Sequence, residues 1–265
     1  MSQYQYIQNG TINAFIFPSM EQECPYLPNR TFLSENFVVD HIDPMELDKL
    51  LALGYRHFGD FFFRPVCESC GECLPIRIPI SEYQFSKRFK RIAKKGSHFK
   101  VTWNEIPDIE SAFALYQDHK TRFDDKEHDD IDNFEHSFFP EMKSSQCICI
   151  YDGDQLIAVS HIDKTNTSVS SVYSYFDRRY EQYSPGWLTM YYEILLAKKT
   201  NSMYYYLGYY IQQNNHMNYK ARVYPNEICI GPGNWTEYYT DKKQIIKPAD
   251  AEKGFWPEVY FPENI

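Results

Sequence analysis

The stretch from residue 147 to residue 211 constrains the fold most, because strand-like and helix-like patterns follow one another there in close succession. CICIY and QLIAVSHID are apolar runs on either side of a turn with Asp152-Gly153 at its tip, which predicts a β-hairpin. SVSSVYSYF predicts a third strand, and WLTMYYEILLAKK predicts a helix. YYYLGYYI predicts a further strand, in which Gly208 indicates a bulge or a splayed edge.

Three antiparallel strands, a helix and another strand form an order that is typical of an acetyltransferase-type (GNAT) core. The sequence therefore predicts an α/β (α+β) protein with a GNAT-like mixed sheet and flanking helices, plus a smaller N-terminal subdomain that carries cysteines. The predicted boundaries give the N-terminal subdomain residues 1–100, the GNAT-like domain residues 101–240 and a tail residues 241–265. The tail is expected to pack on the surface, because the four aromatic residues in FWPEVYF would otherwise be exposed.

Local signals outside this stretch predict two more helices. In DPMELDKLLALG, Asp43 can cap the first turn, Pro44 suits the first helical position and Gly54 ends the helix. A second helix follows Pro107, and its apolar stripe consists of Ile109, Phe113, Tyr116 and Phe123. The acidic run DDKEHDDIDNFE comes next and is typical of a solvated loop.

Charge is distributed unevenly along the chain. The 27 basic and 36 acidic residues give a net charge of −9, which argues against binding nucleic acid through the overall charge. Residues 87–100, however, contain seven basic residues and no acidic one, with Phe89 and Phe99 between them. Such a segment could neutralise several phosphates. The predicted nucleic-acid contacts are Arg88, Lys90, Arg91, Lys94 and Lys95.

Seven cysteines are present, and three of them lie in the motif CESCGEC. Cys67, Cys70 and Cys73, with Cys24 as a distant fourth, have the spacing of ligands to zinc or to an iron–sulfur cluster. The alternative is a reduced, metal-free cluster packed in a small subdomain. The other cysteines lie on strand-like segments and are predicted to be buried thiols, namely Cys147, Cys149 and Cys229.

The N-terminal residues lack the pattern of a secretory signal, and no apolar run is as long as a membrane-spanning helix requires. Cysteines in a clustered, odd-numbered set favour a reducing compartment. We therefore expect a cytoplasmic protein, and a monomer.

Several motifs, in order from residue 24 to about residue 235, resemble the arginyl-tRNA–protein transferase family, and within it the bacterial members that donate leucine. The motifs are CPYLP from Cys24, GYRH from Gly54, RPVCESCGECLPIR from Arg64, VYSYFD from Val172, YLGYYI from Tyr206 and MNYKAR from Met217. Two positions depart from the family's usual pattern: YSPGW precedes the second-half helix, and His57 follows Arg56.

The resemblance implies that the chain transfers leucine from Leu-tRNA to the N-terminal Asp or Glu of acceptor proteins, which creates a degradation signal. The reaction is aminolysis of an ester and needs no cofactor. An α-amino group is already partly neutral near pH 7, so positioning and stabilisation of the oxyanion should carry most of the rate. We expect Tyr209, Tyr219 and Lys220 to supply hydrogen bonds or positive charge, and Asp163 to orient the amine.

The acidic side chain of the acceptor calls for arginine, whose planar fork meets both carboxylate oxygens. Arg56, Arg64 and Arg77 are the candidates, and for each the alternative is an ion pair with an acid such as Asp60 or Glu72.

Three other functions remain open from the sequence. Within the family, the donor could be arginyl-tRNA, since the sequence does not place an acidic residue in the amino-acid pocket. An ordinary acyl-CoA N-acetyltransferase would use a glycine-rich loop before the second-half helix, where this chain has EQYSPGW. A non-enzymatic cysteine-cluster sensor or RNA-binding module would leave the second half unexplained.

Overall fold

The computed structural model describes residues 5–9, 12–122, 130–240 and 243–244. The chain folds into two compact units, each with more contacts inside it than to the rest of the chain. Unit 1 combines Met1–Pro79 with Tyr206–Ile265, and unit 2 is Ile80–Tyr205. The predicted boundaries at residues 100 and 240 differ from this division. The reason is a long-range strand pairing, since Glu227 lies opposite Arg77 and so joins the C-terminal part to the N-terminal one.

Unit 1 contains a five-stranded antiparallel sheet with the strand order β1-β2-β5-β7-β6. Its strands are β1 (Gln5–Asn9), β2 (Ile12–Phe17), β5 (Ser34–His41), β7 (Phe61–Pro65) and β6 (Arg56–Phe58). Unit 1 also has strands in the order β16-β15-β14-β8-β13. These are β16 (Lys243–Gln244), β15 (Asn234–Thr240), β14 (Asn226–Gly231), β8 (Leu74–Pro79) and β13 (Tyr204–Tyr210), which enters unit 1 at Tyr206. The remaining elements are β3 (Gln22–Glu23), β4 (Thr31–Phe32), α1 (Pro44–Ala52) and the 3-10 helix η2 (Asn218–Arg222).

The predicted helix in this unit is confirmed as α1. The Asp43 side chain accepts hydrogen bonds from the backbone N–H groups of Met45 and Glu46, at 2.8 and 2.9 Å. Pro44 occupies the first turn, and Gly54 follows the helix with φ +90°, a conformation that glycine adopts without steric cost.

Unit 2 contains strands in the order β12-β11-β10-β9. Its elements are α2 (Lys87–Lys95), β9 (Lys100–Trp103), α3 (Ile109–Lys120), α4 (Ile131–Phe138), β10 (Ser145–Asp152), β11 (Gln155–Lys164), β12 (Ser168–Phe176), the 3-10 helix η1 (Arg178–Tyr183) and α5 (Pro185–Lys199). The hairpin is confirmed, with Asp152 opposite Gln155 and Gly153 at φ +59°. The predicted order of three antiparallel strands, a helix and a strand, and with it the mixed α/β class, is also confirmed.

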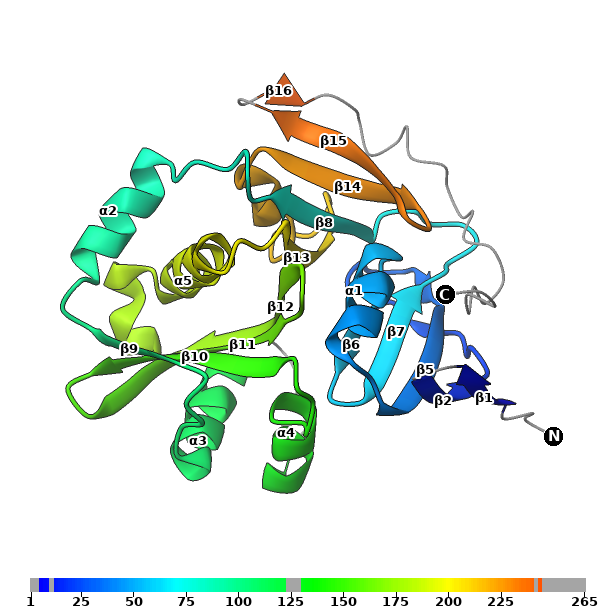
Figure 1. Ribbon diagram of the computed structural model, residues 1–265, viewed down its shortest axis with the longest axis horizontal. Coiled ribbons are helices and arrows are strands. Elements are labelled where there is room, and N and C mark those ends of the chain that lie inside the picture. Colours follow the sequence, from blue (N-terminus) through cyan, green and yellow to red (C-terminus); the bar gives the residue numbers. More distant parts are fainter. Residues whose placement is uncertain (1–4, 10–11, 123–129, 241–242, 245–265) are drawn as a thin grey trace. The chain divides into compact units, whose positions relative to one another are not determined.

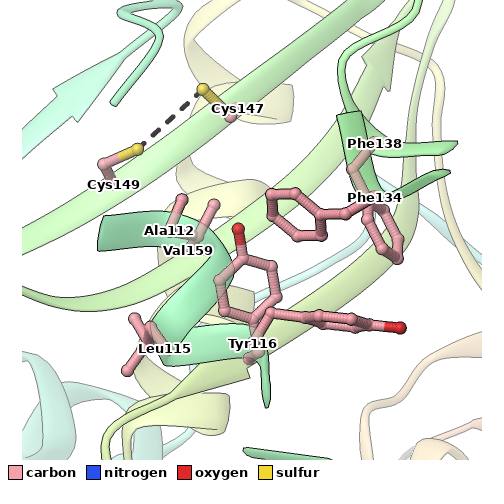
Figure 2. Packing of buried hydrophobic residues seen from close by; sticks show 9 residues of the cluster. Ala112, Leu115, Tyr116, Phe134, Phe138, Cys147, Cys149 and Val159 are labelled. Atoms are coloured by element: carbon pink, nitrogen blue, oxygen red, sulfur yellow. Dashed lines mark hydrogen bonds between the residues drawn. The ribbon is translucent and has the colours of Figure 1, made fainter. Parts of the chain in front are cut away.

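Helices cover both faces of the unit 2 strands, with α3 and α4 on one side and α5 on the other (Figure 1). The middle of β10 is buried on both faces, as expected for a strand that helices cover on both sides. Cys147 and Cys149 belong to the core cluster that contains Tyr116 and Phe134 (Figure 2), whereas Ile150 belongs to the cluster on the α5 side. Cys147, Cys149 and Cys229 are buried thiols, as predicted.

One prediction in unit 2 is wrong. The acidic run was expected to be a loop, but part of it forms α4, which Asp130 caps by accepting a hydrogen bond from the backbone N–H of Asn133 at 2.7 Å. Phe134 and Phe138 bury the inner face of this helix, so packing overrides the local charge. Phe123, and the predicted tail apart from β16, lie outside the described residues.

Candidate active site

A buried lysine is the centre of the candidate site in unit 1. Lys220 lies on η2, and its Nζ donates a hydrogen bond to the main-chain oxygen of Tyr209 at 2.8 Å. Gly208 makes this approach possible, because a Cβ at that position would be only 3.3 Å from Nζ and the backbone there has φ +88°. The absence of a side chain at Gly208 therefore leaves room for the amine of Lys220. Tyr219, the neighbouring residue on η2, is half-buried.

The environment of Lys220 favours its neutral form. The pKa of this amine is lowered from 10.5 to about 7, chiefly by burial and also by the nearby positive charge of Arg56, whereas Cys73 opposes the shift. A lysine with such a pKa can accept a proton at neutral pH and release it again, which an exposed lysine cannot do.

Arg56 brings a second cation next to this lysine. It extends from β6, is buried, and donates a hydrogen bond from Nη1 to the main-chain oxygen of Tyr55 at 2.9 Å. Its guanidinium carbon lies 5.2 Å from the ring centroid of Tyr206 and 6.0 Å from that of Tyr209. The electron-rich faces of these rings help to stabilise a charge that is removed from water. The site thus combines two basic groups and tyrosine rings in a buried setting.

The hydroxyl of Tyr209 is committed to the protein itself. It donates to the main-chain oxygen of Gly54 at 2.9 Å, and the oxygen of Phe63 lies 3.3 Å away. Burial raises the pKa of this phenol well above its ordinary value. In this arrangement Tyr209 serves the site through its ring and its main-chain oxygen.

Arg64 occupies a structural position. Its side chain is fully buried, and its Nε and Nη2 groups donate to Oε2 of Glu35 at 3.0 and 2.5 Å. Tyr55 donates its hydroxyl to the same oxygen at 2.8 Å, and the guanidinium carbon of Arg64 lies 4.5 Å from the centroid of the Tyr55 ring. Glu35 was missed by the sequence reasoning, because nothing local connects it with an arginine 29 residues away.

Arg77 also has a carboxylate partner, though neither of those suggested by the sequence. Its Nε group donates to Oε2 of Glu227 at 2.7 Å, and its Nη1 group donates to the hydroxyl of Tyr206 at 3.3 Å. The guanidinium carbon lies 4.2 Å from the ring of Trp235. Of the three predicted arginines, Arg56 is the one whose charge acts on the buried Lys220.

Asp163 belongs to unit 2. It lies fully buried on β11, opposite Ser145 of β10. The predicted role of Asp163 in orienting the acceptor amine stays a prediction.

The cysteine motif lies in unit 1 and is half-buried. Leu33 donates its backbone N–H to Sγ of Cys67 at 3.3 Å, and Arg30 donates to Sγ of Cys70 at 3.1 Å. Burial and the neighbouring thiols raise the pKa of Cys73. Thiols of this kind are the ligands that zinc and iron–sulfur clusters use. Within the part of the chain that the structure describes, however, no three or more His, Cys, Asp or Glu side chains are grouped as metal ligands would be.

The basic segment forms the amphipathic helix α2 in unit 2. Phe89 and Ile92 are buried, whereas the cations of this helix are exposed, and these are Lys87, Arg88, Lys90, Arg91, Lys94 and Lys95. Phe89 and Phe99 therefore belong to the core and do not face a ligand. The rings that accompany the cations come from elsewhere: Arg88 lies 4.0 Å above Trp187, and Lys95 lies 5.2 Å from the centroid of Tyr183. No helix among the described residues is long and apolar enough to cross a membrane.

Comparison with known proteins finds two matching family patterns. Residues 22–91 match the family pattern described as "Arginine-tRNA-protein transferase, N terminus", and residues 111–230 match "Arginine-tRNA-protein transferase, C terminus". An aspartate/glutamate leucyltransferase from Campylobacter jejuni (strain RM1221) is 31% identical over 222 residues, covering 81% of this chain and 92% of the relative. One from Shewanella sp. (strain ANA-3) is 34% identical over 236 residues, covering 83% and 91%.

Two solved structures show weaker similarity. The structure of L-PGS from Bacillus licheniformis has a TM-score of 0.48 and 8% identity, covering 82% of this chain and 73% of that chain. FemX has a TM-score of 0.44 and 11% identity, covering 81% of each chain.

The mixed α/β fold, the buried basic site and the sequence matches together define an aminoacyltransferase. The chain belongs to the arginine-tRNA-protein transferase family, which its two matched segments cover from residue 22 to residue 230 with one interruption.

Proposed function

We propose that this protein transfers leucine from leucyl-tRNA to the N-terminal amine of proteins that begin with Asp or Glu, and so marks them for degradation. The observation that carries the proposal is the similarity, along both family segments, to relatives named aspartate/glutamate leucyltransferase. We propose that the enzyme acts in the cytoplasm, because charged tRNA and acceptor proteins are both present in that compartment. We propose that it acts as a monomer.

The reaction joins the acceptor amine to the carbonyl carbon of the aminoacyl ester. The bond from that carbon to the ribose oxygen breaks, the amine loses a proton to a base, and the ribose oxygen leaves with a proton. In the proposed mechanism Lys220 accepts the amine's proton, since its pKa of about 7 suits proton transfer at neutral pH.

Arg56 is proposed to hold the acidic side chain of the acceptor. Of the three predicted arginines it is the one beside the buried Lys220, whereas Arg64 and Arg77 are paired with Glu35 and Glu227. Arg56 and Lys220 also influence each other electrostatically. An acceptor carboxylate held here would bring its α-amine, which is only a few bonds away, close to the base.

The exposed cations of α2 are proposed to bind the tRNA backbone, as its phosphates require several positive groups on one face. From their spacing in the sequence, Cys24, Cys67, Cys70 and Cys73 are proposed as ligands of zinc or an iron–sulfur cluster, independently of the transfer step. Metal analysis of anaerobically purified protein tests this, and the absence of stoichiometric zinc or iron would remove the metal from the proposal.

The decisive experiment compares donors and acceptors directly. Purified protein is given tRNA charged with labelled leucine or labelled arginine, and reporter proteins that begin with Asp, Glu or Ala. We expect leucine to be transferred to the Asp and Glu reporters and not to the Ala reporter. Transfer of arginine alone would support the second donor, and equal labelling of all three reporters would defeat the proposed acceptor preference.

A further inference from the structure

The outward face of the five-stranded sheet in unit 1 carries a row of aromatic side chains. The pairing register places Phe15 opposite Val38, Val38 opposite Phe61, and Phe61 opposite Phe58. Residues directly opposite in an antiparallel sheet project from the same face, so the row crosses four strands from β2 to β6. Phe15, Phe61 and Phe58 are 44%, 38% and 37% exposed.

The other face of the same sheet is a normal buried one. Phe37 lies opposite Phe62, which lies opposite His57, and all three are buried. A sheet with one buried face usually presents polar side chains on the other, because nothing there removes apolar surface from water. Three exposed phenylalanines in one row are therefore a feature that a binding surface explains better than the fold does.

The aromatic row lies next to the proposed reader of the acceptor's acidic side chain. Arg56 and Phe58 are two residues apart on β6, so they share a face and are separated by about 7 Å. Arg56 is also opposite Phe63, whose ring lies 6.1 Å from that of Tyr209. On this face of β6, the buried Arg56 and the exposed Phe58 are therefore neighbouring side chains.

We propose that Phe58, Phe61 and Phe15 bind the residues that follow the N-terminal Asp or Glu of the acceptor, in an extended conformation and with apolar side chains. This inference rests on the proposed function and on Arg56 as the carboxylate reader. Three strand spacings separate Phe58 from Phe15, about 14 Å, which an extended peptide spans with roughly four residues. The row itself contains no lysine or arginine, so a phosphate backbone would find no partner on it and a polypeptide is the better occupant.

The test compares two acceptor peptides with one sequence length. Both begin with Asp; one continues with Leu-Phe-Leu-Val and the other with Ser-Gly-Ser-Gly, and a two-residue Asp-Ala acceptor gives the reference KM. Leucine transfer to each is measured with the full chain, with Phe61→Ser, with Phe61→Leu and with Met45→Ser. Met45 is the matched control, since it is also an exposed apolar residue of unit 1 but lies on α1.

We expect the apolar peptide to have a lower KM than the Ser-Gly peptide. Phe61→Ser should raise the KM of the apolar peptide about tenfold relative to the two-residue acceptor, because a buried ring contact is lost. Phe61→Leu should restore most of the difference, and Met45→Ser should leave every ratio as in the wild type. Circular dichroism of each variant verifies folding.

Three results would overturn the inference. One is equal KM values for the two peptides in the wild-type chain, and another is an equal effect of Phe61→Ser on both. The third is a change of oligomeric state in Phe61→Ser by light scattering, which would make the face an interface between copies. If no acidic acceptor receives leucine at all, the proposed function fails instead, so the two failures are distinguishable.

Discussion

Replacing Lys220 by Met tests whether the buried amine loses its proton near neutral pH in the folded chain. The pKa of this group falls from 10.5 to about 7 on folding. Between these values the unfolded chain holds the proton and the folded chain does not, so the unfolded state binds more protons and stability rises with pH. The slope reaches about 1.4 kcal/mol per pH unit. Below pH 7 both states are protonated, and the cost of the buried charge is constant.

The magnitude follows from the same two values. Between pH 7 and pH 9 the wild-type chain should gain about 2 kcal/mol of unfolding free energy relative to Lys220→Met, which has no proton to lose. Urea unfolding of both proteins at pH 7, 8 and 9, followed by circular dichroism, gives this difference directly. Subtracting one protein from the other removes the contribution of all groups that they share, and also the constant loss of the hydrogen bond to Tyr209.

A matched control is Lys87→Met, because Lys87 is an exposed lysine at the start of α2. Its difference from the wild type should not change with pH. A constant difference for Lys220→Met as well would refute the reasoning, because the amine would then keep its proton in the folded chain. In the transfer assay Lys220→Met should lower kcat about a hundredfold or more, as expected for loss of a proton acceptor.

Three further predictions concern other parts of the molecule. Arg64→Met should destabilise the chain by about 3–5 kcal/mol in urea unfolding, because it leaves the buried carboxylate of Glu35 without its cation; a loss below about 1 kcal/mol would contradict this. Gly208→Ala should lower the melting temperature more than Gly153→Ala does, since both glycines have positive φ but only the first would meet another residue; equal losses would argue against close contact with the lysine. Reversal to Glu of three exposed cations of α2 should weaken tRNA binding and flatten its salt dependence in filter-binding assays, and unchanged affinity would exclude this helix. The three are Lys90, Arg91 and Lys94.

Several elements were predictable because their signals are local. The helix that Asp43 caps and Gly54 ends, and the hairpin with Gly153 at its turn, depend on residues within a few positions of each other. The amphipathic character of α2 is also visible in its alternation of cations with Phe89 and Ile92. The acidic run was wrongly predicted to be a loop throughout. Part of it forms α4, because burial of two phenylalanine rings outweighs the preference of acidic residues for solvent.

The site could be predicted only in part. The sequence named Arg56 and Lys220 separately, as a candidate for binding the acceptor and as a candidate for the transfer step; that they lie close together depends on Gly208 and on the packing of η2. The roles of Arg64 and Arg77 depended on Glu35 and Glu227, which lie 29 and 150 residues away along the chain.

By itself, the sequence determined the family, the order of strands and helices in the second half and the basic character of residues 87–100, because motifs, turns and charge runs are properties of neighbouring residues. Only the tertiary structure decided which arginine is buried beside Lys220, which arginines are paired with carboxylates, and that one sheet face presents aromatic rings to solvent. These depend on strand register and burial, which arise when distant segments pack together and exclude water.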